Sequence, residues 1–209
     1  MRTLDLAQAR LSRRMALGGG AAIVAAMALP AAPAAPLAAM PLAARNEVPL
    51  PSDLQARTGI GSVSLDQEGN GALFDARHQP RGSFSTSVVS DNHVTLTVSP
   101  AGARPSTCDL TVTTAGDQLT LNGTLNGQRI LLVASRASRG LVGKPVVPAV
   151  DAATSNAAQA ISQALQAQNQ QHKRECLLHL IVCGMALMHG DYVGAGQALI
   201  NYANCELAG

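Results

Sequence analysis

Apolar and polar residues alternate along the middle of the chain. In residues 93–99 every second side chain is aliphatic and the side chains between them are polar, and the same alternation returns at 108–113 and 119–122. Successive side chains of a β-strand point to opposite faces, so this pattern predicts strands with one buried and one solvated face. We therefore expect half-buried antiparallel strands in this region.

Turn signals separate these segments at intervals of about ten residues. The strongest is Asn126–Gly127, because the tight turn of a two-residue hairpin needs positive φ at both central positions. Further turn-forming clusters stand at 69–71, 90–92 and 115–117. The spacing predicts a meander of about six or seven strands, folded as a small sandwich or a partly open barrel.

The C-terminal region follows a helical pattern instead. Residues 157–171 are dominated by Ala and Gln, and residues 176–188 are apolar nearly all round, which is typical of a buried helix. Asp151 or Ser155 is a candidate N-cap. A break near Gly190 followed by a second helix over 192–207 predicts an α-helical hairpin, so the fold class that we expect is α+β.

The N-terminus has the three parts of a secretory signal peptide. Arginines supply the positive charge, residues 15–29 form an apolar core, and Ala32-Pro33-Ala34 offers small residues for a signal peptidase. The core is shorter than the roughly twenty residues that span a bilayer comfortably. We therefore expect it to be cleaved and to leave no stable membrane span.

The residues Ser12, Arg13, Arg14 and Leu17 resemble a twin-arginine translocation (Tat) signal. The resemblance implies export of a folded protein across the inner membrane. An ordinary Sec signal that contains two arginines is the alternative, and both routes predict a periplasmic or secreted protein. The expected partners during export are the translocation machinery and a signal peptidase.

Shifts in composition set the expected boundaries. They predict an export signal peptide at 1–34, a Pro/Ala-rich extended lead-in at 35–57, an antiparallel β domain at 58–136, a Pro/Gly linker at 137–155 and a Cys-containing helical hairpin at 156–209.

Charge and aromatic content narrow the range of partners. Four of the 15 Lys and Arg but only one of the 13 Asp and Glu precede residue 35, so the remainder is nearly neutral. A neutral surface gives no electrostatic case for binding nucleic acid or anionic lipid. With two Phe, two Tyr and no Trp, the chain also offers few stacking platforms for bases or sugar rings.

Four cysteines in an exported chain are disulfide candidates, because the compartment outside the inner membrane is oxidising. Cys176 lies fourteen residues before Gly190 and Cys205 fifteen after it, so antiparallel helices bring the two to one level. That leaves Cys183 for Cys108, which lies on the inward face of its strand. We expect disulfides Cys176–Cys205 and Cys108–Cys183.

A soft-metal site is the alternative use of the same residues. His172, Cys176, His179 and Cys183 share one helical face, and Cys205 lies across the hairpin. Thiolate and imidazole are ligands that copper and zinc prefer. The stripe is about 16 Å long at 1.5 Å per residue, so a single ion could take only some of these ligands.

No motif in the chain indicates a reaction. There is no Gly-x-Ser-x-Gly turn, and Gly59-Ile60-Gly61 lacks the third glycine of a dinucleotide fingerprint. We therefore expect an exported, non-catalytic binding or interaction protein without a cofactor. It would take a small apolar ligand inside the meander or a protein partner at an exposed strand edge. A protein that binds copper or zinc is one alternative, and a precursor of a secreted Cys-containing peptide is a second.

Overall fold

The computed structural model describes residues 46–66, 70–169 and 176–208, all within one compact unit that spans residues 41–209. The expected export signal, with Ser12, Arg13, Arg14 and Leu17, lies outside the described residues. None of the helices in the described ranges is long and apolar enough to cross a membrane.

Nine antiparallel strands form one open sheet in which each strand pairs with its neighbours in sequence. The fold class is α+β, as expected. Over the described residues the sheet has more strands than predicted, and it is neither closed nor packed against a second sheet. The strands are β1 (Asn46–Pro49), β2 (Ser62–Leu65), β3 (Gly71–Phe74), β4 (Pro80–Ser90), β5 (His93–Pro100), β6 (Ser106–Ala115), β7 (Gln118–Leu125), β8 (Gln128–Ser135) and β9 (Gly140–Leu141).

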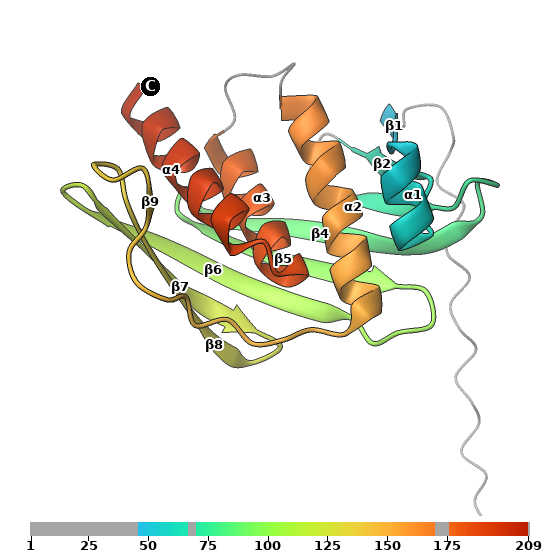
Figure 1. The fold of residues 1–209 in the computed structure, drawn as a ribbon, viewed down its shortest axis with the longest axis horizontal. Helices are drawn as coiled ribbons and strands as arrows, with labels where there is room; N and C mark the ends of the chain where they lie inside the picture. Colours follow the sequence, from blue (N-terminus) through green and yellow to red (C-terminus); the bar gives the residue numbers. More distant parts are fainter. Residues whose placement is uncertain (1–45, 67–69, 170–175, 209) are drawn as a thin grey trace, which may run out of the picture. The chain divides into compact units, whose positions relative to one another are not determined.

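The helices lie together on one face of this sheet (Figure 1). They are α1 (Ser52–Thr58), α2 (Ala152–Asn169), α3 (Cys176–His189) and α4 (Tyr192–Ala208). α3 lies between α2 and α4 and also contacts β5. A two-layer arrangement results, in which the helices bury the apolar face of the sheet.

The alternating pattern of the sequence matches the burial of the central strands. Along β5 the aliphatic residues are fully buried and the polar ones are partly exposed, with Val94, Leu96 and Val98 at 0 % exposure. The hairpin between β7 and β8 turns at Asn126 and Gly127, whose φ values are +52° and +77°. The tight-turn prediction is therefore confirmed.

α3 packs against the sheet at very short range. A Cβ atom built on Gly184 would lie 2.3 Å from Cδ1 of Leu96 and 2.9 Å from Cδ1 of Leu110. Leucine side chains of the sheet therefore fill the space beneath the helix. All residues from Leu180 to Met188 are buried, which confirms the prediction of a buried apolar helix.

The side chain of Asp151 caps the N-terminus of α2. Asp151 accepts the backbone N–H of Thr154 at 2.8 Å, and its other oxygen accepts the Thr154 hydroxyl at 3.0 Å. These bonds lower the pKa of Asp151, with the Thr154 N–H as the main cause. The Thr154 hydroxyl also lies 3.1 Å from that of Ser106 on β6, which joins the helix to the sheet.

Three of the expected segments contain secondary structure that the sequence did not predict. The lead-in at 35–57 is not wholly extended, because it contains β1 and most of α1. The linker at 137–155 contributes β9, and α2 begins within it. The hairpin at 156–209 is a set of three helices, because α2 and α3 pack side by side instead of forming one helix.

Candidate interaction surface

One of the two expected disulfides is present. Cys176 at the start of α3 and Cys205 near the end of α4 form a disulfide with Cα atoms 5.3 Å apart. Counting residues on either side of Gly190 predicted this pair, because antiparallel helices rise equally per residue. The bond closes the open end of the α3–α4 pair.

The other expected disulfide, Cys108–Cys183, is absent, and both residues are free thiols with 0 % exposure. Burial raises the pKa of Cys108 to about 12, and it also raises the pKa of Cys183, to which Cys108 adds a smaller effect. The two cysteines do face the same interface. Leu96 of β5 and Leu110 of β6 lie directly beneath Gly184, the residue after Cys183, so aliphatic side chains occupy the interface around the two thiols.

In the part of the chain that the structure describes, the predicted copper or zinc ligands do not come together in one site. Cys176 and Cys205 are joined to each other, Cys183 is enclosed, and His172 lies outside the described residues. Burial lowers the pKa of half-buried His179. Within residues 46–66, 70–169 and 176–208, no three His, Cys, Asp or Glu side chains are placed to hold a metal ion.

α4 is also tied to the sheet by a hydrogen bond that the sequence did not predict. The Tyr202 hydroxyl donates to the backbone carbonyl of Asp91 at 2.8 Å, in the turn between β4 and β5. Burial is the main cause that raises the pKa of Tyr202. The helical layer is therefore fixed to the sheet at this corner.

The face of the sheet opposite the helices carries polar side chains. On β5 and β6, Nε2 of His93 lies 3.0 Å from Oδ2 of Asp109, and the Thr95 hydroxyl donates to the same oxygen at 3.0 Å. The neighbouring pair Thr97 and Thr107 brings two hydroxyls within 3.4 Å. The His93 imidazole and the Asp109 carboxylate therefore pair with each other across two neighbouring strands, which is typical of a solvated sheet face.

A second polar cluster lies near β1. The Ser62 hydroxyl donates to Oε1 of Glu47, and Nδ1 of His78 lies 3.2 Å from the same oxygen. His78 has a left-handed backbone with φ +57° in the turn between β3 and β4. Because both groups point at the carboxylate and not at each other, the cluster lacks the nucleophile-to-base contact of a catalytic triad.

β4 is longer than the strand beside it, which leaves part of its edge open. β3 pairs with β4 only as far as Phe84, whereas β5 pairs with β4 as far as Ser90. The Asn70 side chain accepts the Thr86 N–H at 3.0 Å, so the backbone is already engaged there. We call residues 87–90 the β4 edge, which among the described residues has a strand partner only on the β5 side.

The β4 edge is uncharged and partly apolar. Its sequence is Ser-Val-Val-Ser, and Val88 and Val89 are 50 % and 59 % exposed. Val88 pairs with the buried Val94, so its side chain lies on the helix-facing side of the sheet, yet it is half exposed. A register shift between Val88 and Ser90 ends the regular part of the edge. Natural edge strands often carry charges, prolines or bulges that block further pairing, and of these the β4 edge has only the register shift.

The sequence predicted an exposed strand edge but not which residues form it. A run of six residues without charge, with two adjacent valines, was the available signal. The difference in length between β3 and β4 became visible only in the paired sheet.

Comparisons with known proteins give no information about function. No family model matches the chain, and neither the curated proteins nor the solved structures yield a match.

Proposed function

We propose that this protein is exported, non-catalytic and disulfide-stabilised, and that it binds a protein partner by adding an extended segment to the β4 edge. The observation that carries the proposal is the one-sided pairing of β4 beyond Thr86, among the described residues, together with the exposure of Val88 and Val89. An open edge offers backbone N–H and C=O groups at strand spacing, and adjacent side chains supply selectivity.

The packing of the helices favours the strand edge over a small apolar ligand. α2, α3 and α4 fill the space over the apolar face of the sheet, which is where such a ligand would lie. The β4 edge, in contrast, has exposed valines beside an open backbone. A protein segment can use both features together.

Site-specific photocrosslinking in exporting cells tests the binding part of the proposal. A photoreactive residue at Val89 should give an adduct of one defined mass, whereas the same residue at Val193, which is 79 % exposed on α4, should give none. Val88→Lys should remove the adduct, because a charge on the edge opposes strand addition. Equal adducts at both positions, or none at Val89, would contradict the proposal, and an adduct of twice the chain mass would identify a second copy as the partner.

Cell fractionation tests the export part separately. The mature protein should start near residue 35 and be found outside the inner membrane. The double variant R13K/R14K should retain the precursor inside the cell if the Tat route is used, and it should be exported normally if the Sec route is used. A wild-type chain that keeps its N-terminus and stays in the cytoplasm would refute export.

A further inference from the structure

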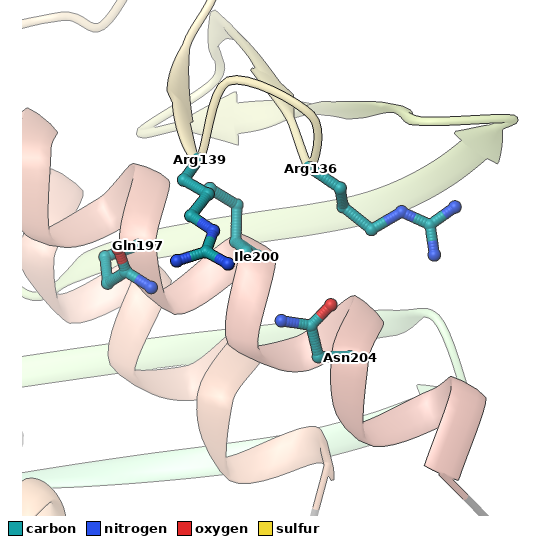
Figure 2. A pocket seen from close by; sticks show the side chains of 5 residues that line it. All are labelled: Arg136, Arg139, Gln197, Ile200 and Asn204. Atoms are coloured by element: carbon teal, nitrogen blue, oxygen red, sulfur yellow. The ribbon is translucent and has the colours of Figure 1, made fainter.

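A pocket of about 340 Å³ lies between the turn that joins β8 to β9 and the helix α4. Two arginines of the turn and three residues of the helix line it: Arg136, Arg139, Gln197, Ile200 and Asn204. The three helical residues are spaced i, i+3 and i+7, so they share one face of α4. Figure 2 shows the turn above this face, with Arg139 reaching toward Gln197 and Ile200.

The walls of the pocket are held together by close packing of α4 on β9. A Cβ atom built on Gly196 would lie 2.6 Å from Cδ2 of Leu141, so α4 rests directly on β9. The turn is closed by the Arg139 N–H, which donates to the Arg136 carbonyl at 3.3 Å. A ligand would therefore meet a formed site and would not need to order a loop.

The lining is cationic and carries no carboxylate. Among the residues that the structure describes, none forms an ion pair with Arg139, whose side chain extends over the helix from a left-handed backbone with φ +53°. Asn204 lies between the two arginines in Figure 2 and is exposed. Gln197 donates one N–H to Asn201 at 3.0 Å, which orients its carboxamide.

Arg136 has an unsatisfied donor. Its side chain is only 19 % exposed and one terminal nitrogen donates to the Gly116 carbonyl, but Nε is enclosed and has no hydrogen bond. The nearest carboxylate, that of Asp117, is 3.9 Å from Nε and 71 % exposed, which is an ion pair beyond hydrogen-bonding distance. Arg136 is therefore held against the turn between β6 and β7, and the exposed Arg139 offers the N–H donors that a ligand can reach.

We propose that this pocket binds a small organic oxyanion, either a carboxylate or a phosphate. Guanidinium groups hold both anions through paired N–H donors. The carboxamides of Gln197 and Asn204 can bond to neighbouring polar groups of the ligand, and Ile200 supplies one apolar contact. The site involves neither β4 nor its edge, so it is independent of the partner proposed above.

Titration of the isotopically labelled protein, purified after export, tests the site by nuclear magnetic resonance. The probes are inorganic phosphate and succinate, with neutral succinamide as the matched control in a low-salt chloride buffer. Saturable shifts should appear in the Asn204 carboxamide and arginine Nε–H signals with at least one anion and not with succinamide. The anion that binds more tightly identifies the class of ligand.

Two variants and one control decide whether the named residues carry the binding. Arg139→Gln should weaken the affinity at least about 10-fold, the size expected for losing a charged hydrogen bond. Asn204→Leu should also weaken it, whereas Arg104→Gln, at an exposed loop arginine, should leave it unchanged. The proposal is overturned if neither anion saturates the signals, if succinamide binds equally well, or if Arg104→Gln weakens binding as much as Arg139→Gln.

Discussion

α3 is joined to α4 by a disulfide bond and contacts the sheet through closely packed aliphatic side chains, although each of these two interfaces contains a pair of cysteines. Cys176 and Cys205 are partly exposed at the open end of the helix pair, whereas Cys108 and Cys183 are fully buried in the middle of the layer. The covalent bond is located where helix ends would otherwise separate. The interior relies on close contact between aliphatic side chains, as the fit of Gly184 over Leu96 and Leu110 illustrates.

The largest effect should come from breaking the covalent interface. Cys176→Ser should lower the free energy of unfolding by about 3–4 kcal/mol, the chain-entropy value for a loop of this length. The two cysteines are 29 residues apart. Urea unfolding measures the change, and the reduced wild type should match the variant; a wild type that is insensitive to reductant would contradict the assignment of this disulfide.

At the buried interface between α3 and the sheet, a polar substitution should lower the free energy of unfolding, whereas a reductant should have no effect there. Cys183→Ser should cost about 1–3 kcal/mol of unfolding free energy, because it places an additional hydroxyl in an apolar interface. Cys183→Ala, which removes the sulfur without adding a polar group, is the matched control and should cost less.

Thiol labelling without reductant checks the same interface. The pKa of Cys108 is raised to about 12, so its thiolate is scarce at neutral pH, and both thiols are buried. We expect no labelled thiol in the folded protein and two per chain after unfolding. No labelled thiol after unfolding would mean that Cys108 and Cys183 are oxidised.

A smaller effect should follow from loosening α2, the neighbour of α3 on its other side. Asp151→Ala should lower the free energy of unfolding by about 1 kcal/mol, because the first turn loses its side-chain acceptor. The lowered pKa of Asp151 means that its stabilising contribution is complete above its ordinary value of 3.8 and is lost as the pH falls through the lower folded value. Asp151→Asn keeps an acceptor and should remove only this acid dependence; equal behaviour of the two variants at neutral pH would exclude the cap as the cause.

The smallest effect should come from the hydrogen bond that fixes α4 to the sheet. Tyr202→Phe removes a donor to the Asp91 carbonyl and should cost roughly 0.5–1.5 kcal/mol. Denaturant unfolding gives the change. Faster hydrogen exchange near residues 90–93 in the variant should localise the loss to that corner, and an unchanged pattern there would argue against this contact.

The sequence contained enough information for the central strands and for one crosslink. Period-two alternation identified the buried face of β5, β6 and β7, because a strand with one covered face must alternate. Asn126–Gly127 located a hairpin by its backbone requirement, and counting from Gly190 paired Cys176 with Cys205. Each of these inferences depends on local geometry that repeats along the chain.

The features that were missed depend on how distant segments meet. Pro49 and Pro51 suggested an extended lead-in, yet Pro51 immediately precedes α1, where a missing N–H costs nothing. The packing of α3 on the sheet, where Leu96 of β5 and Leu110 of β6 lie beneath Gly184, joins residues far apart in the sequence and leaves Cys108 and Cys183 as free thiols. The arginine pocket joins a turn at 136–139 to a helix face about sixty residues later, and no periodicity links the two.

The order of elements along the chain also bears on biosynthesis. All nine strands precede α2, and each pairs with its neighbour, so the sheet can form while the polypeptide is still being made. The three helices that cover its aliphatic face leave the ribosome last. A nascent chain that stops before residue 152 would present bare leucines and valines to other molecules, and we expect such products to precipitate or to be degraded.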